Sequence, residues 1–300
     1  MLSVKPWKPD AILRLFLSVF ICIYAGSLLV TLLHYPSVAA KAGASARFYL
    51  FSGGALAFLG ATLLLMRLPW RLENLMLQVG LSMACFYLGL VLGGLAQKLA
   101  GASSPSVTQM VISALSFQGA ALLWTEVFLR EHRVSWTEAF GLSIQWPQAI
   151  LLGIILACLF LPVGWGLQYV SGQVLTHLPH SPFKPEEQQS VQTLRIASSW
   201  PDRLSLGLVT ILLAPMAEEI LFRGILYPWI KQAGFPRLAL WGTCLVFGAV
   251  HLNLVSFLPL VLLALALTAL YERTNNLLAP ISAHALFNGL NFTMLYLIQK

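Results

Sequence analysis

Charged residues are scarce in this 300-residue sequence, where Asp, Glu, Lys and Arg together make up 10% of the chain. A soluble domain typically carries roughly 25% of these residues, because its surface must be solvated by water. Hydrophobic residues reach 58% of the chain, against roughly 45–50% in soluble domains. These proportions exclude a water-soluble globular protein and indicate an integral membrane protein.

Motifs that would point to a soluble enzyme or a metal protein are also missing. The chain has no GxxxxGKS or GxxxxGKT phosphate loop, no GxSxG, no GxGD and no HExxH. The common signatures of ATPases, serine hydrolases, aspartyl intramembrane proteases and site-2-type metalloproteases are therefore absent. The cysteines form no CxxC pair and each lies in an apolar run, so nothing predicts a disulfide framework or a cysteine zinc site; they are Cys22, Cys85, Cys158 and Cys244.

The net charge of +7 does not indicate a nucleic-acid partner. Lys and Arg lie mostly between the apolar runs, where basic residues anchor loops at the cytoplasmic side of a membrane. We therefore expect the lipid bilayer as a partner and no nucleic acid.

Long apolar runs dominate what is present. A helix needs roughly 20 apolar residues to cross the hydrocarbon core, which is about 30 Å thick. We predict an all-α, polytopic transmembrane bundle with nine spans: Leu15–Leu33, Phe48–Met66, Asn74–Gln97, Ser106–Phe128, Gln148–Val170, Leu204–Ile225, Pro236–Leu252, Val255–Tyr271 and Leu277–Ile298. Eight is the alternative count, because the fourth run contains two glutamines and a glutamate.

One polar stretch suggests a domain boundary. Residues 171–203 hold four prolines, two adjacent glutamates and a run of glutamines, and we expect them to form a solvent loop. The predicted organisation is an N-terminal transmembrane bundle over residues 1–170, this loop, and a C-terminal four-helix catalytic unit over residues 204–300.

The last four predicted spans carry five ionisable side chains beyond Arg237, which stands at the very start of its span: Glu218, Glu219, Arg223, His251 and His284. A charged group at the centre of a bilayer costs at least ~2.5–3.5 kcal/mol, so it usually faces an interior cavity and marks function. Glu219 and Arg223 are four residues apart on one helix face, which predicts an ion pair. Glu218 points about 100° away and is left for chemistry. The alternative is that both acids balance Arg223 or lie at a helix end in water.

Two histidine elements accompany this pair of acids. His251 ends the sequence Phe247–Gly–Ala–Val–His251, and His284 lies four residues before Asn288 on the same helix face. Taken singly, His251 could be an interfacial histidine. His284 and Asn288 could serve only to hydrogen-bond one helix to another. At ~1.5 Å rise per residue, Glu218 and His284 lie at depths of about 10 and 12 Å, and His251 at about 20 Å. A carboxylate and an imidazole can activate water, while an imidazole with an amide can stabilise an oxyanion, which together predict hydrolysis of an acyl bond.

At these residues the sequence resembles the CPBP family of intramembrane proteases, which includes CAAX prenyl proteases of the Rce1 type and bacteriocin-processing enzymes, formerly called Abi. The family motifs EExxxR, FxxxH and HxxxN stand here in order, and the resemblance covers residues 204–297. It implies an intramembrane endopeptidase in which Glu218 is the general base, acting on water with His251. It further implies that His284 and Asn288 form the oxyanion hole, and we expect structural support from Glu219, Arg223 and Phe247.

The sequence leaves alternatives open for both the cofactor and the function. We expect no metal, but Glu218, His251 and His284 could instead hold one zinc ion with a position left for water. The alternative functions are a non-catalytic immunity, chaperone or scaffolding protein of the same fold, and a transporter. The resemblance implies a peptide or protein substrate, prenylated or of bacteriocin type. The expected location is the plasma membrane of a bacterium, or the endoplasmic reticulum if the source is eukaryotic.

Overall fold

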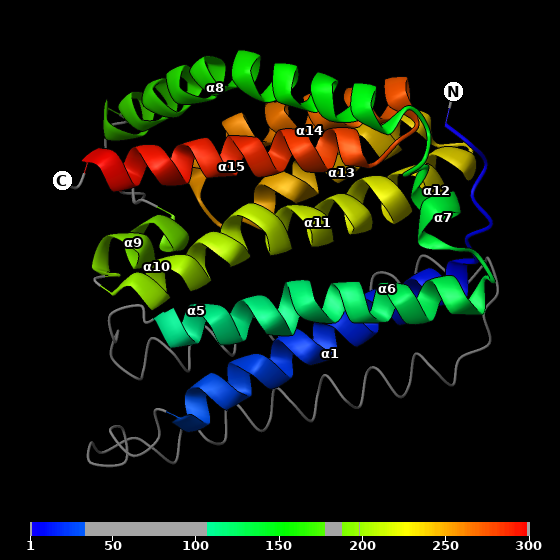
Figure 1. Ribbon diagram of the computed structural model, residues 1–300, viewed down its shortest axis with the longest axis horizontal. Helices are drawn as coiled ribbons and strands as arrows, with labels where there is room; N and C mark the ends of the chain where they lie inside the picture. Colours follow the sequence, from blue (N-terminus) through cyan, green and yellow to red (C-terminus); the bar gives the residue numbers. More distant parts are fainter. Residues whose placement is uncertain (1, 34–106, 178–187, 198, 299–300) are drawn as a thin grey trace. The chain divides into compact units, whose positions relative to one another are not determined.

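The computed structural model describes residues 2–33, 107–177, 188–197 and 199–298, and throughout these residues the regular secondary structure is helical (Figure 1). The predicted all-α fold is confirmed. The chain divides into two compact units, one formed by residues 1–8 with 125–300 and the other by residues 9–124.

The unit of residues 9–124 is described by α1 (Pro9–Leu33), α5 (Val107–Ala114), η1 (Leu115–Gly119) and the start of α6 (Ala120–Glu131). Helix α1 packs against α5 and the π-helical η1. Gly26 permits this approach, because a Cβ atom there would lie 1.9 Å from the Ser116 hydroxyl oxygen. The predicted spans Phe48–Met66 and Asn74–Gln97 lie outside the described residues.

The larger unit is built on three long helices. Helix α8 (Trp146–His177) packs against α14 (Leu254–Thr274) and α15 (Leu278–Ile298). Their buried contact holds Phe160, Leu263, Leu267, Ala279 and Ala283. The remaining helices are α7 (Trp136–Phe140), α9 (Gln189–Ile196), α10 (Trp200–Gly207), η2 (Leu208–Leu213), α11 (Ala214–Glu219), η3 (Ile220–Leu226), α12 (Tyr227–Gln232) and α13 (Pro236–Ala249). Helix α13 packs between α12 and α14 (Figure 1).

The helix that carries the two glutamates changes register twice. Residues 200–232 form one continuous helix in which the π-helical η2 and η3 flank α11. A proline closely follows each of these two π segments. Proline disturbs the α-helical register, because it has no N–H and its ring clashes with the carbonyl of the residue four positions earlier. Immediately before Pro215, the Ala214 N–H reaches the Val209 carbonyl; immediately before Pro228, the Tyr227 N–H reaches the Phe222 carbonyl. Both bonds span five residues, so the helix is widened on either side of α11.

Five described helices are long and apolar enough to cross a membrane, which supports an integral membrane protein. They are Pro9–Ser27, Val107–Glu131, Trp146–His177, Trp200–Gln232 and Leu254–Thr274. The predicted count of eight or nine spans is not confirmed. Helix α13 has 14 residues, fewer than the roughly 20 that one crossing needs, and α15, with 21 residues, is not among the five.

The segment predicted as a solvent loop is partly helical. Helix α8 continues to His177 and α9 occupies Gln189–Ile196, while α10 begins at Trp200. Long α8 exposes many apolar side chains, as a lipid-facing helix does. The division of the chain into residues 1–170, 171–203 and 204–300 stays a prediction.

Residues 2–8 pack onto the larger unit. The Trp7 indole is buried against Phe128 and His132, and its N–H donates to the Gly224 carbonyl of η3 at 3.3 Å. The Lys5 ammonium donates to the Ala139 carbonyl at 2.7 Å, and burial lowers its pKa. These contacts fasten the N-terminal segment both to α7 and to the turns of η3 that follow the two glutamates.

Candidate active site

Glu219 and Arg223 form a buried ion pair between α11 and η3. The Arg223 Nη1 atom lies 3.0 Å from the Glu219 Oε1 atom, and both side chains are excluded from solvent. The second guanidinium nitrogen donates to the Ala264 carbonyl of α14 at 3.2 Å. The guanidinium carbon also lies 4.5 Å from the centre of the Phe247 ring, a cation–π distance. The spacing of four residues predicted this pair, and the pair ties the glutamate helix to α13 and α14.

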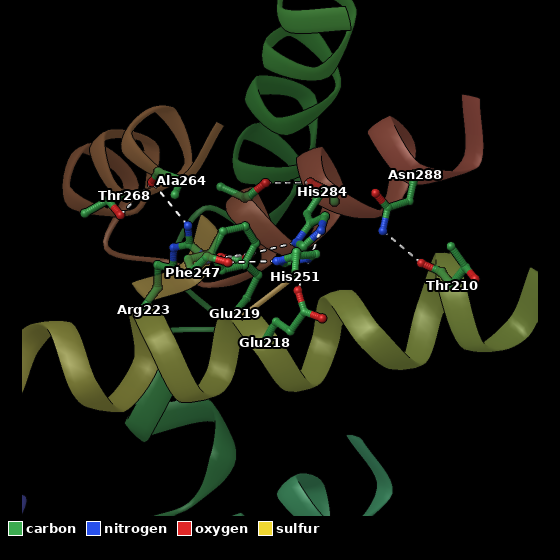
Figure 2. Close-up of polar contacts among 12 residues, drawn as sticks. Thr210, Glu218, Glu219, Arg223, Phe247, His251, Ala264, Thr268, His284 and Asn288 are labelled. Carbon is green, nitrogen blue, oxygen red and sulfur yellow. Dashed lines mark hydrogen bonds and ion pairs between the residues drawn. The ribbon is translucent and has the colours of Figure 1, made fainter. Parts of the chain in front are cut away.

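His284 of α15 lies between the two glutamates (Figure 2). Its Nδ1 atom is 2.8 Å from Glu219 Oε1, and its Nε2 atom is 4.0 Å from Glu218 Oε2. An ionised carboxylate only accepts hydrogen bonds, so Nδ1 carries a proton and donates it to Glu219. Glu219 therefore fixes the ring so that Nε2 faces Glu218. Sequence reasoning assigned Glu219 only to Arg223, and no local spacing reveals a contact across 65 residues.

Phe247 brings His251 and His284 to the same place. The Phe247 side chain is fully buried on α13, and its ring centre lies 5.1 Å from that of His251 and 5.8 Å from that of His284. The His251 Nδ1 atom lies 2.7 Å from the Phe247 carbonyl oxygen, which orients the ring and leaves Nε2 for another partner. The depth difference expected between the two histidines is not a barrier to their meeting, because both rings contact one phenylalanine.

Asn288 lies one turn after His284 but apart from the cluster, as Figure 2 shows. Its Nδ2 atom donates to the Thr210 carbonyl of η2 at 3.0 Å. The structure thus gathers six of the predicted residues, while the seventh, Asn288 of α15, is hydrogen-bonded to η2. The six are Glu218, Glu219, Arg223, Phe247, His251 and His284.

Glu218 is the second carboxylate of the cluster. Its side chain is buried, and its Oε2 atom has no hydrogen-bond partner among the described residues. A buried polar atom without a partner is costly, so this oxygen would gain from a further polar group bound beside it. The 4.0 Å between Oε2 and His284 Nε2 is too long for a direct hydrogen bond. It is a separation that one bridging polar group can span. The pair can therefore act on a group held between them.

Glu218, His251 and His284 are the residues that the zinc alternative requires. Within the part of the chain that the structure describes, no three His, Cys, Asp or Glu side chains are grouped closely enough to hold one metal ion. Glu218, His251 and His284 therefore do not assemble a zinc site in this conformation. The expectation of metal-free chemistry stays a prediction.

Comparisons with known proteins point to the same region. The fold and the cluster define an all-α integral membrane protein with a buried carboxylate–histidine site. The family described as Type II CAAX prenyl endopeptidase Rce1-like matches residues 200–290, which include every residue of the predicted site. The predicted resemblance to this family is confirmed over these residues.

Two bacterial proteins are similar to parts of the chain. UPF0177 protein YaiF of Lactococcus lactis is 27% identical over 154 residues, which cover 50% of this chain and 65% of YaiF. The uncharacterized protein YpbD of Bacillus subtilis is 34% identical over 82 residues, or 26% of this chain and 39% of YpbD. The chain thus spans less than two thirds of the length of each relative. No solved structure matches the chain significantly.

Proposed function

We propose that this protein is an intramembrane endopeptidase of the CAAX type that hydrolyses a peptide bond with an activated water molecule. The observation that carries the proposal is the position of His284 between two buried carboxylates: Glu219 is already paired with Arg223, whereas the Glu218 Oε2 atom lies 4.0 Å from His284 Nε2 without a hydrogen-bond partner among the described residues. The family matched by residues 200–290 supports the same reaction class.

Glu218 is the general base in this proposal. It takes a proton from water, His251 helps to hold that water, and the water oxygen attacks the carbonyl carbon of the scissile bond. When the tetrahedral intermediate collapses, Glu218 returns the proton to the leaving amine nitrogen. General-base catalysis of this kind contributes typically 10²–10⁴ in rate.

His284 and Asn288 are the proposed donors to the oxyanion. The His284 Nδ1–H already donates a hydrogen bond to Glu219, so the ring can also donate from Nε2 only when it carries both protons, as an imidazolium, before the water attacks. The negative charge of Glu219 stabilises that cation. The Asn288 amide has two hydrogens and gives one to the Thr210 carbonyl, so the second remains for the substrate.

The proposed substrate is a peptide or protein segment anchored in the bilayer, prenylated or of bacteriocin type. Five apolar helices place the chain in a membrane, and the bacterial relatives support the plasma membrane of a bacterium as its location. An anchored substrate would reach the buried glutamate laterally, from within the bilayer.

The test uses purified protein in liposomes with one peptide made in two forms, farnesylated and unmodified near its C-terminus. Wild type is compared with Glu218→Gln and with Asp202→Asn, a control on the same continuous helix about four turns earlier. We expect cleavage by wild type and by Asp202→Asn and none by Glu218→Gln, and mass spectrometry of the products locates the bond. Equal cleavage by all three proteins would refute the proposal. Binding of either peptide without cleavage would favour the non-catalytic alternative.

A further inference from the structure

The Thr210 carbonyl lacks both of its ordinary helical partners. In an α-helical register it would accept from the Ala214 N–H, but that N–H reaches the Val209 carbonyl instead. In the π-helical register it would accept from the N–H of residue 215, but that residue is Pro215, which has none. Pro215 thus leaves the Thr210 carbonyl, five residues earlier on η2, without either its α-helical or its π-helical donor.

Asn288 satisfies this carbonyl from another helix. Its Nδ2 atom lies 3.0 Å from the Thr210 oxygen, across the packed contact between η2 and α15. Glycines face the partner helix on both sides of this bond: a Cβ added to Gly289 would lie at van der Waals distance, 3.6 Å, from Ile211 Cγ2, and one added to Gly207 would lie 3.6 Å from the Phe292 ring. The side-chain amide is therefore held by a fixed acceptor, in a fixed direction.

We infer that Pro215 is a positioning residue for the peptidase reaction, acting through the Thr210 carbonyl on the Asn288 amide. This inference rests on the proposed function and deepens it. The hydrogen bond uses one Nδ2–H and stops the amide from rotating, so the second Nδ2–H keeps one direction relative to His284. A donor that is already oriented stabilises an oxyanion without reorganising during the reaction.

The inference also explains why proline stands three residues before Glu218. Its ring prevents the helix from returning to an α register at Ile211, which maintains the widened η2 turn. An alanine at position 215 would restore an N–H that competes for the Thr210 carbonyl, and would allow the turn to close. The Asn288 amide would then lose its fixed acceptor.

The experiment combines kinetics with a measurement that needs no activity. Four proteins form a double-mutant cycle: wild type, Pro215→Ala, Asn288→Ala and the double variant. Pro259→Ala is the control, because Pro259 is also a buried proline inside a helix, on α14. In parallel, the asparagines are labelled with ¹⁵N, and the side-chain signal that disappears in Asn288→Ala is followed in Pro215→Ala. If Pro215→Ala gives little folded protein, Pro215→Val restores the same N–H with a side chain closer in size.

We expect Pro215→Ala to lower kcat by roughly 10- to 100-fold with little change in KM, because a misplaced group costs turnover more than binding. The double variant should be no slower than Asn288→Ala alone, since the two residues act as one unit. The Asn288 amide signal should shift in Pro215→Ala and stay in place in Pro259→Ala.

Two results would overturn the inference: effects of Pro215→Ala and Asn288→Ala that multiply in the double variant, or an amide signal that Pro215→Ala leaves unmoved. A wild type without peptidase activity would instead refute the proposed function. The amide signal would still decide whether Pro215 fixes Asn288, so the two failures are distinguishable.

Discussion

His284 Nδ1 lies 2.8 Å from Glu219 Oε1, the same oxygen that lies 3.0 Å from Arg223 Nη1. One carboxylate atom therefore joins a cation fixed on its own helix to an imidazole on α15. The two adjacent glutamates differ in their contacts: Glu219 Oε1 binds both Arg223 and His284, whereas Glu218 Oε2 makes no hydrogen bond among the described residues and lies 4.0 Å from His284 Nε2. This division leads to separate expectations for stability and for activity.

Replacing Arg223 by Ala should destabilise the protein as well as inactivate it. The change leaves the fully buried Glu219 without its cation, and breaking a buried pair in this way typically costs 3–5 kcal/mol. The control is Arg14→Ala, which removes an ion pair of the same four-residue spacing that is partly exposed. An exposed pair contributes about 0–1 kcal/mol. Thermal unfolding in detergent should separate the two variants clearly; equal midpoints would show that the buried pair is not structural.

Replacing Glu218 by Gln should lower turnover while leaving the stability of the protein almost unchanged. The Oε2 atom of Glu218 has no hydrogen-bond partner among the described side chains and backbone groups, so a neutral amide costs the fold little. Removing the general base should still lower turnover by about 10²–10⁴. Thermal unfolding and peptide cleavage are measured on the same preparation. A variant that cleaves at the wild-type rate would show that another group activates the water.

Chelation tests the choice between carboxylate and zinc chemistry. If Glu218 is the general base without a metal, a strong chelator should leave purified enzyme active. If zinc activates the water, chelation should stop turnover and added zinc should restore it. Elemental analysis accompanies turnover before and after chelation. Stoichiometric zinc whose removal stops turnover reversibly would make Glu218, His251 and His284 ligands and would require a rearrangement of the present site.

Local features of the sequence predicted local features of the structure. The apolar runs predicted helices because a run of roughly 20 such residues can be buried in lipid. The spacing of Glu219 and Arg223 predicted their pairing because both lie on one helix face. The apolar run predicted as a span extends from Pro236 to Leu252, but the observed helix α13 ends at Ala249, just before the turn that carries His251.

Contacts between distant helices were not predictable in this way. The bond from His284 to Glu219 joins helices 65 residues apart in sequence, and its partner depends on how α15 packs. The acceptor of Asn288 depends on a helical register that Pro215 changes, a feature with no signal in hydrophobic periodicity. Spacing identified candidate site residues, while packing determined their hydrogen-bond partners.

The last prediction concerns Trp7, which lies far from the glutamates in sequence but contacts the turn after them. Its indole N–H donates to the Gly224 carbonyl of η3, and its ring is buried against Phe128 and His132. Trp7→Phe keeps most of the ring contact and removes only the hydrogen bond, so it should lower the free energy of unfolding by about 0.5–1.5 kcal/mol. Trp7→Ala also removes the ring and should cost about 3–5 kcal/mol.

Activity should follow the same order, because η3 carries Arg223 and thereby holds Glu219 beside His284. We expect Trp7→Phe to retain most peptide cleavage and Trp7→Ala to lose much of it at temperatures where both proteins remain folded. Denaturant unfolding in mixed micelles and cleavage at several temperatures provide the two measurements. If Trp7→Phe and Trp7→Ala lowered stability equally, the hydrogen bond rather than the ring would fasten residues 2–8. If Trp7→Ala left both quantities unchanged, the N-terminal segment would have no role in supporting the site.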